Sequence, residues 1–392
     1  MKPSRFCAFW RRLLGSIAVT TLTFQASADP LYWDTSANGG SWSAGAPWST
    51  NDTIGGAAPA SGPGINDVAY FTVTSPPNVG QTVNLDGNQS VSGLVTVSQT
   101  FNTTILAGTA TNPILNLGAG GIVHARGGLT IGSTSTPAQA VNVILLASQE
   151  WSSDTAGGGA AAIVVHNNVS STGSPRDLVL KGINTGTQIN GNITDGGAGA
   201  ELKITKRESG IWSLAGAAST FGGNLKIEAG TIRLSNGGAA TPSKIEVLEG
   251  AILAIRGLGT ATFSDPQFET YRSSVTFRAN SILSIDTNNS NYTYAGTFGA
   301  ATPFKLDKSG GNTLTLTGNN SAYLGSTSVT DGTLALAVPN AAPGPITVET
   351  NGTLAAVAGS PGFPGFTVSE IGALITATTF KGAGSFGIST AN

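Results

Sequence analysis

The segment ITKRESGIWSLAGAASTFGGNLKIEAGTIRL, residues 204–234, is matched by LDKSGGNTLTLTGNNSAYLGSTSVTDGTLAL, residues 306–336, without a gap and at a spacing of 102 residues. The matching positions carry lysine, apolar residues and glycine, and they include the pairs Lys206 and Lys308, Leu214 and Leu316, Phe221 and Tyr323, and Gly230 and Gly332. An internal repeat of this kind indicates a fold in which each structural unit stacks on the next.

Apolar and polar residues alternate within each copy, as in Trp212-Ser213-Leu214 and Leu314-Thr315-Leu316, and glycines separate the alternating stretches. Because this alternation is typical of short β-strands with one buried face, each copy is predicted to form three strands. The match continues at the same spacing to Gly250 and Gly352. Each of these glycines is predicted to open a further strand.

Similar but less regular stretches occur upstream, at residues 83–87, 91–97, 114–118 and 128–132. Strands this short become stable when successive rungs stack about 4.8 Å apart and form continuous apolar ladders. With roughly 20 to 25 residues per rung, the chain gives about 15 rungs and a rod near 70 Å long. The predicted fold is therefore all-β, a right-handed parallel β-solenoid (β-helix) with an N-terminal capping region.

The composition favours strands over helices. Only 10% of the 392 residues are charged, whereas 54 are glycine and 40% are hydrophobic. Helices on such a chain would lack the charged residues that normally cover their exposed face, while short strands with glycine turns do not need them. The hydrophobic fraction is large enough for a folded core.

The first 28 residues have the three parts of a secretory signal peptide. Four basic residues precede or flank an uncharged stretch from Leu13 to Phe24, and Ala26-Ser27-Ala28 follows as a cleavage site. Removal of this segment takes away four of 19 basic residues, none of the 21 acidic ones and the only cysteine, Cys7, so a formal charge of −6 remains. The mature chain is predicted to have no transmembrane helix and no basic patch for nucleic acid.

The second copy of the repeat resembles the autotransporter-associated β-strand repeat proteins, which are exported by bacteria. The resemblance rests on residues 306–311, residues 314–320, Tyr323, Gly325 and residues 331–334. The first copy departs from the pattern at Glu208-Ser209 and at Ala217-Ala218. Passengers of this family that are autotransporters continue into a C-terminal translocator, which the sequence through Asn392 does not show. The resemblance therefore implies either that the chain is truncated before a translocator or anchor, or that another device exports it.

Residues 29–75 are similar to the opening of such passengers and contain half of the six tryptophans. We interpret Trp33, Trp42 and Trp48 as part of a capping region that protects the end of the solenoid, with a carbohydrate-stacking surface as the alternative. The predicted domains are a signal peptide at 1–28, the cap at 29–75 and the solenoid at 76–392. Its clearest repeats lie at 204–255 and 306–356.

No catalytic, cofactor-binding or metal-binding residue is predicted. His124 and His166 have no acidic neighbours at metal-ligand spacing and are interpreted as polar residues of rungs or loops. No Gly-x-Ser-x-Gly motif, phosphate-binding loop or calcium-binding nonapeptide occurs. Isolated acids such as Asp195, Asp307 and Asp331 are interpreted as turn residues. The cluster of Lys203, Lys206, Arg207 and Glu208 is interpreted as a solvated face.

The sequence leaves three functions open. The first is a secreted or cell-surface passenger with a structural or adhesive role and no catalysis, which binds glycans or other cell-surface components through many weak contacts. The second is a carbohydrate-active β-helix enzyme, which would need carboxylates converging in one groove. The third is a passive spacer in a longer exported protein.

Overall fold

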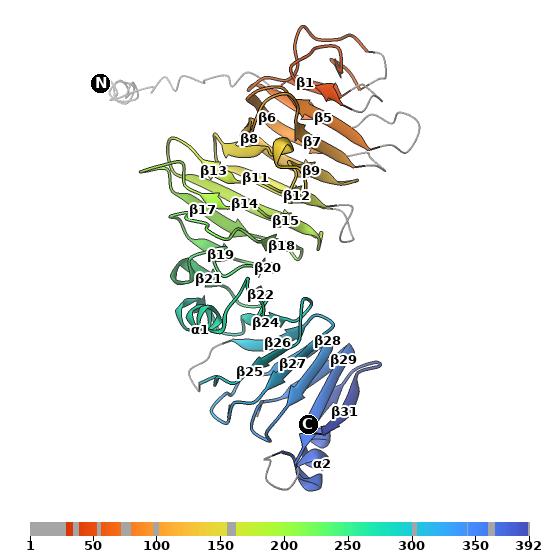
Figure 1. Cartoon of the computed structure of the whole chain (residues 1–392), viewed down its shortest axis with the longest axis vertical. Helices are drawn as coiled ribbons and strands as arrows, with labels where there is room; N and C mark the ends of the chain where they lie inside the picture. Colours follow the sequence, from red (N-terminus) through yellow and green to blue (C-terminus); the bar gives the residue numbers. More distant parts are fainter. Residues whose placement is uncertain are drawn as a thin grey trace, which may run out of the picture.

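A computed structural model describes residues 29–33, 39–52, 56–71, 80–96, 102–154, 162–299, 304–342, 344–359 and 365–390. The predicted signal peptide, residues 1–28, lies outside these ranges. Figure 1 shows an elongated molecule in which strands stack along the long axis in sequence order, from the N-terminal region at one end to α2 (Val368–Ala377) and β31 (Ser385–Thr390) at the other. This arrangement is a parallel β-solenoid, as the sequence predicts.

One face of the rod is a sheet that we call sheet A. All its neighbouring strands run parallel except β1 and β3, and the path continues for eleven strands. In spatial order they are β3 (Trp48–Ser49), β1 (Asp29–Trp33), β4 (Asp67–Tyr70), β6 (Gln89–Thr96), β8 (Ile114–His124), β11 (Gln149–Ser153), β14 (Arg176–Gly182), β17 (Leu202–Lys206), β19 (Leu225–Ile227), β21 (Ile245–Val247) and β23 (Thr276–Phe277), with β10 (Asn142–Leu145), β13 (Val169–Ser171) and β16 (Ile193–Thr194) branching from β8.

A second ladder, sheet B, runs along another face, and its strands are also parallel. The pairing runs through β2 (Gly40–Ser41), β5 (Gln81–Leu85), β7 (Thr103–Ala107), β9 (Leu129–Ile131), β12 (Ile163–Val165), β15 (Thr187–Ile189), β18 (Ile211–Leu214), β20 (Thr231–Leu234), β22 (Ile252–Arg256), β24 (Ile282–Asp286), β26 (Lys305–Ser309), β28 (Thr327–Leu336) and β29 (Ile346–Ala358). Beside this path, β25 (Tyr292–Tyr294) pairs with β27 (Thr313–Leu316) and β27 with β28, while β30 (Thr378–Phe380) and β31 both pair with β29.

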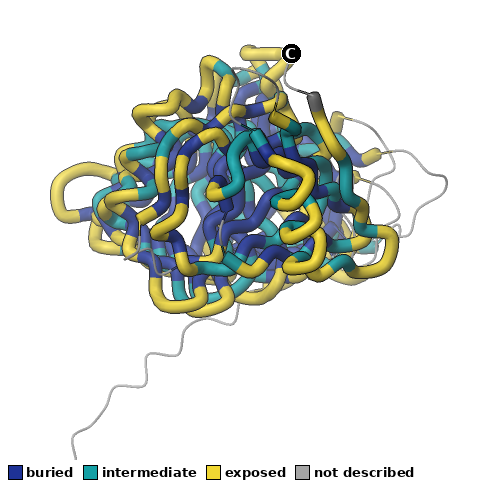
Figure 2. The backbone as a smooth tube through the Cα atoms, turned by 90° about the horizontal axis from the view of Figure 1, so that it is seen from below, coloured by how far each residue is buried: buried dark blue, intermediate teal, exposed yellow. Residues whose placement is uncertain are grey.

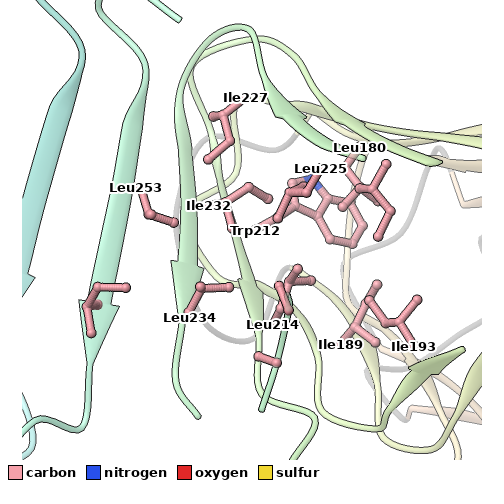
Figure 3. Packing of buried hydrophobic residues seen from close by; sticks show 14 of the residues in the cluster. Leu180, Ile189, Ile193, Trp212, Leu214, Leu225, Ile227, Ile232, Leu234 and Leu253 are labelled. Carbon is pink, nitrogen blue, oxygen red and sulfur yellow. The ribbon is translucent and has the colours of Figure 1, made fainter. Parts of the chain in front are cut away.

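The core lies inside the coil, because every second residue of a strand points inward. Along sheet B, Trp212, Ile232 and Leu253 occupy one inward column, and Leu214 and Leu234 belong to the next. Figure 3 shows these side chains packed against others from sheet A, and Figure 2 shows buried backbone on the inside with exposed turns outside. Stacked identical positions thus build one continuous apolar core.

The three N-terminal tryptophans belong to this core. Trp33, Trp42 and Trp48 are all 0% exposed, and Trp48 packs edge-on against the other two at ring-centroid distances of 5.0 and 5.3 Å. Their burial removes the rings from any carbohydrate-stacking surface. Beside them, β1 pairs with β4 on one side and antiparallel with β3 on the other.

Steric constraints require glycine after Ala229 in the first copy and after Asp331 in the second. Gly230 and Gly332 both have positive φ, +67° and +66°, and a Cβ would lie 2.1 Å from the carbonyl oxygen of Glu208 and 2.3 Å from that of Gly310. Only glycine fits this conformation and close approach. The predicted Asp331-Gly332 turn is a kink inside the long strand β28, where the register shifts.

The sequence did not predict the two α-helices, α1 (Asp265–Ser274) and α2. Both begin with a capping box: Gln267 accepts a hydrogen bond from the Ser264 backbone N–H at 2.9 Å, and Glu370 accepts one from that of Thr367 at 2.8 Å. Both helices lie at the same place in the two copies, between β22 and β23 and between β29 and β30. The repeated unit is therefore longer than the sequence match, extending over residues 204–286 and 306–389.

The spacing between equivalent residues is not constant along this unit. The equivalent residues Leu225 and Thr327 are 102 positions apart. Leu225 pairs with Ile245 and Thr327 with Ile346, and these two partners are only 101 positions apart. Gly250 lies in the turn before β22, whereas Gly352 lies inside β29, so the predicted equivalence of these two glycines is wrong. Two short 3-10 helices, Pro137–Gln139 and Pro242–Lys244, complete the described elements.

Candidate functional site

Charged side chains stack on the outward face of sheet A. Because inward positions alternate with outward ones, the outward residues of neighbouring strands lie beside each other at the strand spacing of about 4.8 Å. The outward charged residues of this face, from β11 to the end of β23, are Glu150, Asp154, Asp177, Lys181, Lys203, Arg207, Lys226, Glu228, Glu246 and Arg278. We call this set the charged face.

Ion pairs join side chains of the charged face, both between neighbouring rungs and along one rung. The Lys181 ammonium lies 2.7 Å from the Glu150 carboxylate, and the Glu228 carboxylate lies 2.9 Å from Arg207 and 3.0 Å from Lys226. These partners lower the pKa of Glu228, and the hydrogen bond to Glu150 raises the pKa of Lys181. Such exposed pairs contribute little to stability, so a ligand can replace them at small cost.

A shallow groove of about 580 Å³ lies at the N-terminal end of the charged face, over β8, β11 and β14. Three carboxylates and one ammonium line it: Glu150, Asp154, Asp177 and Lys181. Glu150 is engaged by Lys181, and Asp154 accepts a hydrogen bond from the Ser152 hydroxyl at 2.5 Å. The groove offers polar contacts to a hydroxyl-rich or charged ligand; within the described ranges, no three His, Cys, Asp or Glu residues are grouped to hold a metal ion.

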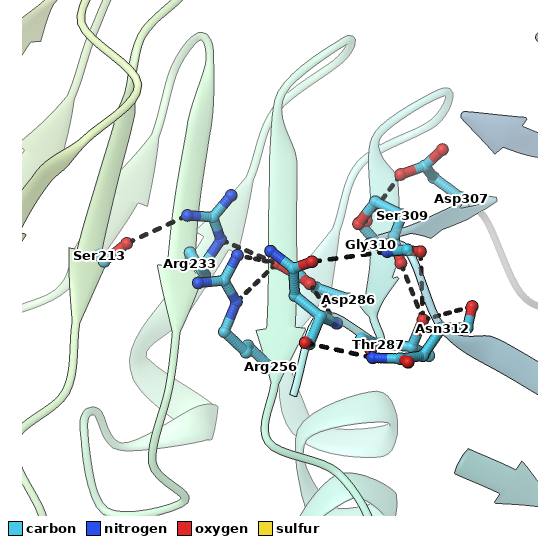
Figure 4. Close-up of polar contacts among 12 residues, drawn as sticks. Ser213, Arg233, Arg256, Asp286, Thr287, Asp307, Ser309, Gly310 and Asn312 are labelled. Carbon is cyan, nitrogen blue, oxygen red and sulfur yellow. Dashed lines mark hydrogen bonds and ion pairs between the residues drawn. The ribbon is translucent and has the colours of Figure 1, made fainter. Parts of the chain in front are cut away.

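A second polar cluster lies on sheet B. Figure 4 shows Arg233 and Arg256 reaching the carboxylate of Asp286 from two successive strands. Their Nε atoms lie 3.0 and 2.8 Å from Oδ2 of Asp286, whose side chain is 3% exposed, while Oδ1 accepts a hydrogen bond from the Asn288 backbone N–H. Burial, followed by the Arg256 charge, lowers the pKa of Arg233.

The same network includes an acid that the sequence analysis placed in a turn. Asp307 lies within β26, is 9% exposed, and accepts hydrogen bonds from Ser284 at 2.6 Å and from Thr330 at 3.1 Å. Burial raises its pKa. The turn interpretation is wrong for Asp307 because its partners come from β24 and β28, the neighbouring rungs, which a local motif does not reveal. Asp195 does serve a turn: its carboxylate accepts hydrogen bonds from the backbone N–H groups of Leu202 and Gly222.

Of the four residues predicted to form a solvated face, Lys203, Lys206, Arg207 and Glu208, one is not solvated. Lys206 is 0% exposed and donates hydrogen bonds to the carbonyl oxygens of Arg207, Glu208 and Ala229 at 2.5, 2.5 and 3.2 Å. Its repeat partner, Lys308, is also 0% exposed and donates to those of Ser309, Gly310 and Asp331. Burial lowers the pKa of each lysine to about 8. These lysines connect successive rungs inside the coil.

The histidines lie where the sequence places them, in or beside strands. The His124 Nδ1 lies 3.0 Å from the Ser153 hydroxyl and its Nε2 lies 2.6 Å from the Gly127 carbonyl oxygen. Both His124 and Ser153 are 0% exposed, so this serine-histidine contact is closed to a substrate. Motif searching misses it because the two residues are 29 positions apart and meet only through the pairing of β8 with β11.

Comparison with protein families finds the passenger-associated-transport-repeat at residues 204–234 and 306–336. Each of these two segments contains an interior lysine, a kinked glycine and stacked strands. Neither the search of curated proteins nor that of solved structures returned a match. In the part of the chain that the structure describes, none of the helices has the length and apolar character needed to cross a membrane.

Proposed function

We propose that this chain, which carries two copies of the passenger-associated-transport-repeat, is a passenger segment of an exported protein that acts as a binding rod without catalysis. The repeat supports export to the cell surface or secretion. The predicted ligands are glycans or other cell-surface components. The signal peptide predicted at residues 1–28 agrees with this location.

The observation that carries the proposal is the charged face. Its side chains repeat at the rung spacing of about 4.8 Å along a rigid parallel sheet, so one extended ligand can contact several rungs at once. Each contact is weak because the groups are exposed and screened by salt. A sum of weak contacts gives adhesion that depends on the length of the ligand and on ionic strength.

Binding of the folded mature chain, beginning at Asp29, to a glycan array tests the proposal. The test variant is Lys203→Ala with Lys226→Ala, which removes one exposed and one partly buried lysine from the charged face. The matched control is Lys305→Ala with Lys381→Ala, which removes two exposed lysines elsewhere and leaves the same net charge. We expect binding that weakens with salt, falls in the test variant and is retained in the control.

Equal binding by both variants would show that the ligand binds at a site other than the charged face. A folded chain that binds nothing would favour the spacer function.

A carbohydrate-active enzyme is the second candidate, and the groove with Glu150, Asp154 and Asp177 favours it. Hydrolysis needs two carboxylates about 5 to 9.5 Å apart, one on each side of the scissile bond. Incubation of the chain with the polysaccharides it binds, followed by a reducing-end assay, separates the two functions. Turnover that is lost in Asp177→Asn would support the enzyme, and binding without turnover supports the passenger.

A further inference from the structure

The ion cluster on sheet B holds two arginines and a single carboxylate that joins them (Figure 4). Oδ2 of Asp286 accepts a hydrogen bond from Nε of Arg256 at 2.8 Å and lies 2.8 Å from Nη2 of the same guanidinium. Nε of Arg233 lies 3.0 Å from this oxygen, but its N–H is not aligned to donate a hydrogen bond. Because Oδ1 is engaged by the Asn288 backbone N–H, the carboxylate satisfies Arg256 and leaves Arg233 poorly paired.

Arg233 is therefore a largely buried cation with weak partners. Its side chain is 17% exposed, and the one hydrogen bond that it makes to a described residue is long, 3.4 Å from Nη1 to the Ser213 hydroxyl. Burial, followed by the nearby Arg256 charge, lowers the pKa of Arg233. A buried charge that lacks a well-aligned counter-ion is unfavourable, so the site would gain from a further anion.

The coil does not need this cluster. Strand register places Ala335, Val357 and Ser389 of the second copy at the three equivalent positions. The same rungs thus form with small, uncharged side chains. Since replacing buried ionic groups by apolar ones is often neutral or stabilising, stability does not explain why the first copy has two arginines here.

Each arginine keeps one terminal amino group for a ligand. Nη2 of Arg233 and Nη1 of Arg256 have no hydrogen-bonding partner among the described residues. Of the nitrogen atoms of these two side chains that lack a partner, only Nε of Arg233 is enclosed, so both Nη groups reach the surface. The cluster therefore presents two N–H donors, each on a different guanidinium.

This arrangement suits a carboxylate. Arginine N–H groups pair with carboxylate oxygens through charge-assisted hydrogen bonds, and two donors on neighbouring side chains can take one oxygen each. Asp286 holds the guanidinium of Arg256 by two of its nitrogens, which reduces the freedom that a ligand would have to remove. Asp286 is thus a positioning residue for the pair.

The neighbouring outward positions determine what can carry the carboxylate. On the preceding rungs, Arg233 is aligned with Ser213 of β18 and Gln188 of β15, which are both half-buried and uncharged. Their hydroxyl and amide groups can exchange hydrogen bonds with sugar hydroxyls. On the following rungs the same column leads to Asp307, an acid that would repel a second anionic group. A ligand with one carboxylate here and neutral groups over β18 and β15 fits both sides.

We propose that Arg233 and Arg256 bind the carboxylate of an acidic glycan on the outward face of sheet B, with the adjoining sugar units lying over β18 and β15. This site is separate from the charged face, which lies on sheet A. The choice of a glycan as the carrier rests on the proposed function, whereas the recognition of a carboxylate rests on the cluster alone.

A charged ligand and its neutral derivative test the proposal. An oligogalacturonate and its fully methyl-esterified form have the same sugar units, but only the first has free carboxylates. Each is titrated into the folded mature chain at low ionic strength by isothermal calorimetry. We expect an affinity at least about tenfold higher for the acid than for the ester, the difference that a charge-assisted hydrogen bond can give.

Variants of the chain locate the recognition. Arg233→Ala with Arg256→Val and Asp286→Ser gives the first copy the residues of the second, so it should fold, which circular dichroism checks. Arg233→Gln is a milder variant that leaves the pair of Arg256 with Asp286 intact. Lys381→Ala is the control, because it removes one exposed positive charge, the same net change as in the triple variant. We expect the preference for the acid to disappear in the triple variant, to fall in Arg233→Gln and to remain in the control.

Three outcomes would overturn the proposal: no saturable binding of the acid, equal affinity of the wild-type chain for acid and ester, or an unchanged preference in the triple variant. The charged-face variant, Lys203→Ala with Lys226→Ala, separates this inference from the proposed function. We expect it to keep the preference for the acid. A preference that is lost there and retained in the triple variant would place carboxylate recognition on the charged face, which would contradict this inference and support the proposed function.

Discussion

The two copies of the repeated unit, residues 204–286 and 306–389, have the same order of strands and a helix at the same place, but they differ at their ends. Ile285 and Ile388 are the same residue type at the same position, and one is 0% and the other 62% exposed. The difference lies in the next rung, because β26 covers β24 whereas no described strand covers β31. In a solenoid, burial is a property of neighbouring rungs and not of the rung's own sequence.

The copies also differ on their outward faces. The first copy has an ion cluster of Arg233, Arg256 and the buried Asp286, whereas the second has Ala335 and Val357 where the arginines stand. The inward features, an interior lysine and a glycine with positive φ, occur in both. Repeats of this kind therefore share what the coil needs inside and vary outside.

The largest expected effect is at the ion cluster. Asp286→Ala leaves two partly buried guanidinium groups next to each other without a counter-ion, and we expect a loss of about 4 kcal/mol in the free energy of unfolding. The comparison in the second copy is Glu349→Ala, which breaks the exposed pair with Lys381 and should cost less than about 1 kcal/mol. Urea unfolding monitored by circular dichroism measures both. A loss below that of Glu349→Ala would show that the cluster is solvated.

The isoleucine pair gives the next effect. Ile285→Ala removes a fully buried side chain and should destabilise the chain by about 3 kcal/mol, while Ile388→Ala should cost less than about 1 kcal/mol. The chemistry of the two substitutions is identical, so the unfolding midpoints in urea isolate the contribution of the covering rung. Similar losses in both variants would mean that β31 is covered in solution.

The interior lysines give a pH dependence that both copies share. Their pKa is about 8 in the folded chain and near 10.4 in an unfolded one, so between these values the unfolded state binds more protons. The free energy of unfolding should therefore rise with pH above about 8. Measurement should stop near pH 9.5, because Tyr271 and Tyr323, with pKa values raised to about 12 by burial, oppose the trend at higher pH.

The control is the double variant Lys206→Met, Lys308→Met, which keeps the long side chain but cannot titrate. Thermal unfolding followed by circular dichroism from pH 7 to 9.5 should show a rising midpoint in the wild type and a weaker dependence in the variant. An unchanged slope would assign the pH effect to other groups.

The smallest effect is expected on the charged face. Arg207→Ala removes one of the two cations that hold Glu228. The Arg207 side chain is 50% and that of Glu228 29% exposed, so the loss should be below about 1 kcal/mol. The same substitution should weaken ligand binding measurably at low salt, since that face is the proposed contact surface. Urea unfolding and binding on the glycan array measure the two effects separately.

The repeat and its alternation predicted the parallel solenoid because inward positions are read directly from sequence. Lys206 and Asp307 were misplaced because they have partners in adjacent rungs, 23 residues away, and no local pattern reports these contacts. The helices escaped prediction because ten residues with few charges carry a weak periodic signal, although the Ser264 to Gln267 and Thr367 to Glu370 spacings were visible as capping boxes. The charged face could not be predicted from the sequence, because its residues are brought together only by the register of the strands in sheet A.

Hydrogen exchange of the mature chain tests the central claim, that each rung is protected by the rung that covers it. Mass spectrometry of peptides from residues 276–286 and 378–390 compares the same strands in the two copies. The account predicts slow exchange in the first and exchange faster by at least about tenfold in the second, because β24 is enclosed by β22 and β26 whereas β31 pairs on one side only. Equal protection of the two segments would contradict it.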